Sequence, residues 1–215
     1  SLPLMWAVGL GVTVPLFSLR TEGSWGIGEI GDLPRFARWL RGAGVRLIQL
    51  LPLGEIAGGE TSPYSALTAF GIDPMYLSMT ALDDLPAGDL AAMVGDDGVR
   101  TIAWLREQPK VEYEAVRWLK KKALDAAFVR FRTNVVGGGS AREQDFAAFT
   151  REHAAWLDDY ALFRALKDAL GQRAWLEWPP GVRERNPEAL KNARAELTDG
   201  VLKHQWLQWL AHRQW

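Results

Sequence analysis

The first fifth of the chain predicts two strands with a helix between them. Residues 7–14 (AVGLGVTV) are apolar and β-branched without an alternating polar face, which is typical of a strand buried on both sides of a parallel sheet. Apolar positions three or four apart predict a helix over 32–42, with Asp32 as its N-cap. Residues 45–51 (VRLIQLL) predict a second strand, ended by Pro52. Strand, helix and strand with short links form a βαβ unit, so we expect parallel strands.

The rest of the chain is mostly helical in pattern. Residues 54–90 combine glycines, prolines and aromatic residues, and predict a loop-rich segment. Apolar residues at helical spacing predict helices over 98–132 and a helical pair over 143–170. A long helix is predicted from Asn186, its cap, to Trp215. Because two strands rarely form a stable sheet and the helical pattern continues to the last residue, we expect a larger parent fold.

Composition narrows the class of protein. Of the 215 residues 48% are hydrophobic and 24% are charged, which favours a packed core over disorder. The net charge is -1, so no basic surplus suggests binding to nucleic acid or an anionic membrane. The absence of cysteine excludes disulfides, thiolate metal sites and a cysteine nucleophile. The lack of cysteine fits a cytoplasmic protein, although secreted bacterial enzymes can also lack it. Residues 2–17 are uncharged with no preceding Lys or Arg, so we expect no signal peptide.

The segment GIGEIG contains the pattern G-x-G-x-x-G at Gly26, Gly28 and Gly31. This pattern binds dinucleotides when its first glycine ends a strand and an acidic residue ends the next strand. Here the extended segment ends near Leu16 to Leu19, and the six residues RTEGSW follow before Gly26. No carboxylate ends the second predicted strand. We therefore expect the glycines to allow a tight turn with close backbone approaches, and no dinucleotide site.

The stretch 60–77 (ETSPYSALTAFGIDPMYL) offers groups that suit a polyol. It follows a predicted strand, and loops at the carboxyl ends of parallel strands bind ligands in α/β proteins. Its hydroxyl groups, carboxylate and aromatic faces are Ser62, Tyr64, Ser65, Glu60, Phe70 and Tyr76. A purely structural loop is the alternative interpretation of the same residues.

The histidines and the adjacent pairs of aspartates are weaker candidates for a functional site than residues 60–77. The three histidines lack metal-ligand spacing, so we expect them to serve packing or the surface, and no metal site is predicted. Adjacent aspartates usually point apart, so we expect solvated carboxylates at Asp83/Asp84, Asp96/Asp97 and Asp158/Asp159.

Several motifs, in order, resemble the start of the 4-α-glucanotransferases (amylomaltases, disproportionating enzymes) of glycoside hydrolase family 77. They are GVTVPLFSLRTEGSWGIGEIGDLPRFARWLRGAGVRLIQLLPLGE, SPYSALTAFGIDPMYL, WLDDYALFRALK and HQWLQWLAHRQW. The resemblance implies an α/β fold, the N-terminal portion of a (β/α)₈ TIM barrel with its first two strands and a mainly helical insertion. Residues 1–82 would start the barrel and carry a substrate-side loop, 83–185 would form the helical insertion, and 186–215 a long helix leading back before strand three.

The resemblance also implies an activity, the transfer of α-1,4-glucan segments between maltodextrins by a retaining double displacement without metal or organic cofactor. Ser62 and Tyr64 match positions that line the family's sugar site, and Glu60 takes the place of a family Asp. The family's three catalytic acids lie in later motifs such as R-x-D-H-F-R-G, which this sequence lacks. They are expected beyond Trp215, so no residue here is assigned as catalytic and the segment alone is expected to be inactive.

Departures from the family pattern leave a second interpretation open. Glu29 stands for an Asp, Asp73 for an Asn and Thr68 for a Ser, and no tyrosine shortly precedes SPY. A segment of an enzyme predicts self-association or pairing with the missing C-terminal part, whereas the alternative is a standalone, non-catalytic glucan-binding or interaction module.

Overall fold

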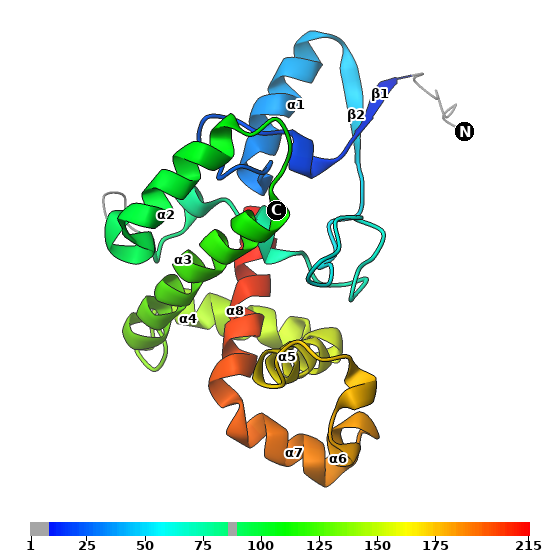
Figure 1. Ribbon diagram of the computed structural model, residues 1–215, viewed down its shortest axis with the longest axis vertical. Helices are drawn as coiled ribbons and strands as arrows, with labels where there is room; N and C mark the ends of the chain where they lie inside the picture. Colours follow the sequence, from blue (N-terminus) through cyan, green and yellow to red (C-terminus); the bar gives the residue numbers. More distant parts are fainter. Residues whose placement is uncertain (1–8, 86–89) are drawn as a thin grey trace, which may run out of the picture.

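The βαβ unit forms as predicted. The computed structural model describes residues 9–85 and 90–215, so residues 7 and 8 of the predicted first strand lie outside the described part. Strand β1 (Leu10–Val14) pairs in parallel with β2 (Val45–Leu50), and α1 (Leu33–Gly42) connects them (Figure 1). The parallel pairing is thus confirmed.

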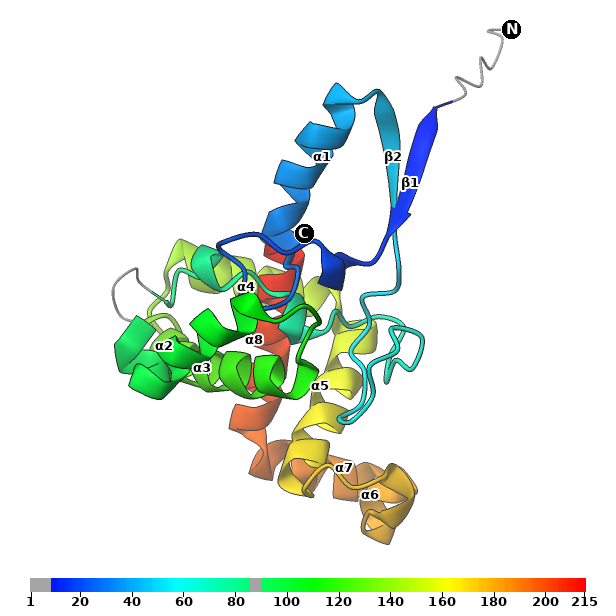
Figure 2. The same cartoon turned by 45° about the horizontal axis from the view of Figure 1, so that its top comes forward.

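The prediction that the first strand is buried on both faces is wrong for its described residues. Leu10 on β1 and Leu47 on β2 are each 63% exposed. Figure 2 shows the two strands and α1 projecting together from the helical body. The sheet of the described residues has two strands, and no residue of either strand is fully buried.

Helices make up most of the described fold. The helices after β2 are α2 (Leu90–Glu107), α3 (Tyr113–Asn134), α4 (Ala141–Glu152), α5 (Ala154–Ala169), α6 (Pro180–Arg183), α7 (Pro187–Glu196) and α8 (Thr198–Gln214). Single 3₁₀ turns occur at Leu16–Ser18, Ile30–Asp32, Pro74–Tyr76, Met79–Ala81 and Trp175–Glu177. The helical segments predicted within 98–132 and 143–170 are confirmed, and α8 runs through the middle of the helical body beside α5 (Figure 1).

The single helix predicted from Asn186 to Trp215 is instead two helices. Asn186 caps α7 as predicted, but the chain turns at Leu197, whose φ and ψ are -104° and 26°. At this bend the Thr198 hydroxyl donates to the carbonyl oxygen of Arg194 at 3.1 Å. A threonine hydroxyl that bonds to the backbone competes with the regular helical ladder, which accounts for the break.

The main core lies where α3, α4 and α8 meet. Trp206 and Trp209 on α8 are at most 1% exposed, and the ring of Phe131 lies 5.8 and 5.6 Å from theirs. Phe146 of α4 adds an edge-to-face contact with Phe131 at 5.3 Å. Aromatic pairs at these distances contribute beyond the burial of their area, so α8 is firmly held in the fold.

The turn after β1 confirms the structural role of the glycines. A Cβ on Gly28 would lie 1.9 Å from the carbonyl oxygen of Leu16, and Gly26 has a φ of +82°. Neither position tolerates a larger residue without moving the backbone.

Asp32 does not cap α1, contrary to the prediction. Its carboxylate turns back and accepts hydrogen bonds from the Thr21 hydroxyl at 2.6 Å, the Ser24 hydroxyl at 2.9 Å and the Glu29 N–H at 2.7 Å. Because three donors of the preceding turn saturate this carboxylate, Asp32 stabilises the turn rather than the helix.

Candidate functional site

An exposed loop follows β2 and carries the residues predicted to bind sugar. We call residues 54–72 the β2 loop; it lies beside α5 (Figure 2). Antiparallel bridges join Gly54 to Ile72 and Ile56 to Ala66. The loop therefore has a paired base, while its outer residues project into solvent.

The outer part of the β2 loop holds all three predicted sugar-binding residues. Tyr64 is 72% exposed, and its N–H donates to the Ser62 hydroxyl at 3.3 Å, which keeps these residues close together. Glu60 is also exposed. Phe70, another predicted aromatic face, is 66% exposed and stacks on Trp156 of α5 at 6.1 Å. Hydroxyl, carboxylate and aromatic groups are thus available on one loop.

Tyr76 does not belong to this exposed set, contrary to the prediction. It is 3% exposed, and burial raises the pKa of its hydroxyl well above the ordinary value. It lies in the 3₁₀ turn that follows Asp73, where it joins the main core. A ring enclosed in this way cannot stack on a sugar.

Sequence reasoning missed a buried carboxylate at the base of the loop. Glu55 is 6% exposed; the Tyr160 hydroxyl donates to its Oε2 at 2.6 Å, and Arg164 Nε lies 3.0 Å from its Oε1. Burial raises the pKa of Glu55 to about 7, although the charge of Arg164 opposes this rise. No local pattern signals such a site, because both partners lie on α5.

Asp73 is the second buried carboxylate of the base. Its side chain accepts hydrogen bonds from the N–H groups of Met75 at 3.0 Å and Ile56 at 3.2 Å. Arg117 of α3 donates to it at 3.4 Å. Burial raises the pKa of Asp73, against the effect of the Arg117 charge. The Asp-Pro pair followed by a helical turn is the sequence signal for this capping role.

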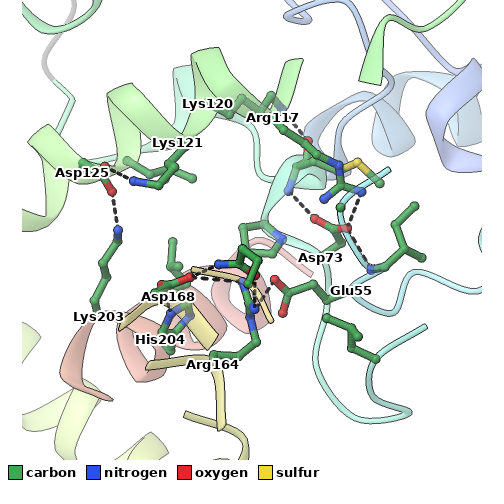
Figure 3. Close-up of a pocket in the computed structure, with 18 of the residues that line it drawn as sticks. Glu55, Asp73, Arg117, Lys120, Lys121, Asp125, Arg164, Asp168, Lys203 and His204 are labelled. Atoms are coloured by element: carbon green, nitrogen blue, oxygen red, sulfur yellow. Dashed lines mark hydrogen bonds and ion pairs between the residues drawn. The ribbon is translucent and has the colours of Figure 1, made fainter. Parts of the chain in front are cut away.

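Beneath the loop lies a cavity of about 370 Å³ between the loop, α3, α5 and α8 (Figure 3). Its charged lining residues are Arg117, Lys120, Lys121, Arg164, Lys203, Glu55, Asp73, Glu114, Asp125 and Asp168. Lys121 and Lys203 both contact Asp125, and His204 Nε2 lies 2.8 Å from Asp168. Because cations balance the carboxylates, the cavity has the character of a structural ion-pair network.

The contacting residues His204 and Asp168 of the cavity both have shifted pKa values, for different reasons. Burial lowers the pKa of His204. Burial alone would raise the pKa of Asp168, but the hydrogen bond and charge of His204, with the charge of Arg164, lower it to about 2. Asp168 is therefore held as a carboxylate, which is unsuited to donating a proton near neutral pH.

Metal-ligand clusters and membrane-spanning helices are both absent from the described residues. Within residues 9–85 and 90–215, no three or more side chains of the His, Cys, Asp and Glu types gather as metal ligands. Nor is any helix of that part sufficiently long and apolar to cross a membrane.

The prediction of solvated aspartates is wrong for Asp84, which is 6% exposed and paired with Arg142. Its burial follows from the packing of α4 against this segment.

Comparison with known proteins decides the family. The family model described as 4-alpha-glucanotransferase, glycoside hydrolase family 77, matches residues 14–215. The chain belongs to this family. It is 37% identical to the 4-alpha-glucanotransferase of Synechocystis over 192 residues and 37% identical to that of Thermus thermophilus over 195 residues. These alignments cover 89% and 90% of the chain, and the chain spans 36% of each relative's length.

Part of each of two solved amylomaltases has the same fold as this chain. The amylomaltase from Streptococcus agalactiae, solved in complex with acarbose, matches with a TM-score of 0.78 and 25% identity, covering 96% of this chain and 39% of that one. The Corynebacterium glutamicum amylomaltase matches with a TM-score of 0.71 and 25% identity over 96% of this chain and 27% of its own. The predicted family and the α/β character are thus confirmed.

Proposed function

We propose that this chain forms part of a 4-α-glucanotransferase, which transfers α-1,4-glucan segments between maltodextrins by a retaining double displacement. The observation that carries the proposal is the family match over residues 14–215. In this proposal β1, α1 and β2 begin a (β/α)₈ barrel, with residues 1–82, 83–185 and 186–215 as its start, its helical insertion and its returning helix. The exposed Leu10 and Leu47 agree with strands that need further partners.

The proposed contact with glucan is the outer part of the β2 loop. The exposed ring of Tyr64 can stack on the C–H face of a sugar, while the hydroxyl of Ser62 and the carboxylate of Glu60 can bind sugar hydroxyls. The exposure of Glu60 and Tyr64, with the partly exposed Ser62 on the same loop, supports this assignment. The partners are therefore maltooligosaccharides, together with either a second copy or the remaining part of the enzyme along the uncovered strands.

The double displacement itself needs residues that this chain lacks. A retaining mechanism requires a carboxylate nucleophile and a carboxylic acid on either side of the scissile bond. Beneath the loop, the buried Glu55 is held by Arg164 and the Tyr160 hydroxyl, and the buried Asp73 by Arg117 and backbone N–H groups. We therefore assign no catalytic residue here, and the comparisons give the standalone-module alternative no support.

The test combines binding with activity. We expect saturable binding when the chain is titrated with maltoheptaose, and at least tenfold weaker binding by Tyr64→Ala. The matched control is Trp39→Ala on α1, which removes a ring with 68% exposure far from the loop in sequence and should leave binding unchanged. Equal binding by Tyr64→Ala would contradict the site. Disproportionation of maltotriose by the chain alone would contradict the assignment as a partial enzyme.

A further inference from the structure

The β2 loop is fixed at its base and exposed at its tip, residues 57–65. At the base, the Glu55 N–H donates to the Gly71 carbonyl at 3.2 Å, and the Asp73 N–H donates to the Leu53 carbonyl at 2.8 Å. From the tip, one hydrogen bond reaches a helix, that of the Gly59 N–H to Glu114 at 3.3 Å. The direction in which the tip points is therefore set mainly by whatever holds the base.

Gln208 of α8 holds one side of this base. Its Nε2 donates to the Ile72 carbonyl at 2.8 Å, and its Oε1 accepts from the Ile72 N–H at 2.9 Å. The side chain is fully buried. This two-point contact fixes the plane of the peptide groups on both sides of Ile72, much as a neighbouring strand would.

The same arrangement recurs six residues further along α8. Gln214 accepts from the Ser78 N–H at 2.7 Å and donates to the Ser78 carbonyl at 3.1 Å. Both glutamines are 136 residues from their backbone partners. Helix α8 thus acts as a template for residues 72–78, and the end of the loop has a fixed position on this helix.

Tyr160 and Arg164 of α5 hold the other side of the base through Glu55. The Tyr160 hydroxyl donates to Glu55 at 2.6 Å and accepts from Gln208 Nε2 at 3.1 Å, so it joins the two sides. Figure 3 shows Arg164 and Glu55 directed toward each other. Because the side chains of Glu55, Tyr160 and Gln208 are buried, water cannot readily replace these hydrogen bonds.

We propose that Tyr160 and Gln208 are positioning residues that set the direction in which the β2 loop presents Ser62 and Tyr64 to glucan. This inference rests on the proposed function of the loop. Neither residue needs to touch the sugar, since each acts through the backbone or the Glu55 side chain. Two helices that lie far from the β2 loop in the sequence, α5 and α8, therefore control glucan affinity.

Tyr160→Phe is the sharpest variant, because it removes one oxygen atom. The ring would remain against the loop, because a Cβ added at Gly71 would lie 3.0 Å from Tyr160 Cε2. It would also keep its contact with Trp156, whose ring centroid lies 5.8 Å from that of Tyr160. Tyr113→Phe is the matched control. The ring of Tyr113 packs against Phe17 at 6.2 Å, and its hydroxyl makes no hydrogen bond within the described part of the chain.

Amide hydrogen exchange tests the positioning directly. We expect the protection factors of the Glu55, Leu67 and Asp73 amides to fall about tenfold in Tyr160→Phe, because each lies at the paired base. Amides of α3 should keep their protection, and Tyr113→Phe should resemble the wild type. Unchanged protection of the base in Tyr160→Phe would overturn the proposal.

Maltoheptaose titration then tests the link to sugar binding. We expect Tyr160→Phe to weaken binding about fivefold, and to have a smaller effect when Ser62→Ala is already present, because both act on one contact. Equal effects in both backgrounds would overturn the proposal. An absence of maltoheptaose binding by the wild type would instead contradict the proposed function, while the exchange experiment still decides whether Tyr160 positions the loop.

Discussion

Lys120 of α3 lies 2.8 Å from the carboxylate of Glu29 in the turn after β1, and both side chains are at most 3% exposed. The same ammonium group donates to the carbonyl oxygens of Met75 at 2.7 Å and Leu77 at 2.8 Å. Burial lowers the pKa of Lys120, and the charge of Glu29 opposes that effect. One side chain therefore joins the GIGEIG turn, the segment after the β2 loop and α3.

Replacing Lys120 by alanine should strongly destabilise the fold. The carboxylate of Glu29 would stay buried without its partner, which costs about 3–5 kcal/mol of unfolding free energy. Lys121→Ala is the matched control, because Lys121 is 67% exposed and pairs with Asp125 one turn away. Its loss should cost less than about 1 kcal/mol. Urea unfolding measures both, and similar losses in the two variants would contradict this role of Lys120.

The burial of Lys120 shows what helical periodicity reveals and what it omits. Lys120 lies between Lys121 and Leu119, and a run of three lysines suggests a solvated face. Its position four residues after the buried Val116 places it on the core side of α3. The helical spacing therefore predicts that Lys120 faces the core. Its partner Glu29 lies in a turn that no local pattern connects to this helix.

Gly28→Ala should disrupt folding without affecting any nucleotide. The new Cβ would lie 1.9 Å from the Leu16 carbonyl and 2.8 Å from the Leu19 nitrogen, both backbone atoms with little room to move. We expect a loss of about 3 kcal/mol or more, which lowers the melting temperature by about 10 °C. Gly58→Ala, with no atom within 4 Å of its added Cβ, is the control.

The same experiment addresses the G-x-G-x-x-G pattern. If the glycines serve only close packing, NAD added to the wild type should not raise its melting temperature. A measurable stabilisation by NAD would contradict the structural interpretation of Gly26, Gly28 and Gly31.

Arg142→Lys should be destabilising despite the retained charge. Arg142 donates through Nη1 to Asp84 at 2.6 Å, forms a second contact through Nη2, and lies over the ring of Trp209 at 5.4 Å. Lysine cannot reproduce the forked contact with a buried carboxylate, so we expect a loss of about 1–3 kcal/mol. Arg213→Lys, at a residue with 44% exposure that also lies over Trp209, should change unfolding free energy much less. Equal losses in chemical denaturation would count against the forked contact.

The sugar-binding loop was partly predictable, and the reasons lie in particular residues. The exposure of Tyr64 and the partial exposure of Ser62 follow from a polar, turn-rich stretch after a strand. The burial of Tyr76 could not be predicted, because the 3₁₀ turn begun by Asp73 directs that ring inward. Tyr160 contacts Glu55 across 105 residues, so their pairing depends on how the helices pack rather than on any spacing in the sequence.

Glu55→Gln should change how stability depends on pH. Burial raises the pKa of Glu55 from 4.5 to about 7 in the fold. Protonated Glu55 therefore contributes stability that is fully present below pH 4.5 and is lost as the pH rises through about 7. The side chains facing it are Arg164, Tyr160, Asp73 and Asp168. Asp73 also has a raised pKa, so the measured change reports on the two carboxylates together.

The variant isolates this contribution because glutamine cannot ionise, yet its amide oxygen can still accept from Tyr160. From pH 4.5 to pH 8.5, the unfolding free energy of the wild type should fall by about 3 kcal/mol relative to that of Glu55→Gln. Urea unfolding at half-unit intervals of pH gives both curves. Parallel curves would show that Glu55 titrates alike in the folded and unfolded chain, and would contradict its enclosure beneath the loop. A deficit of the wild type that grows between about pH 4.5 and 7 and levels off above that range is the result that its burial demands.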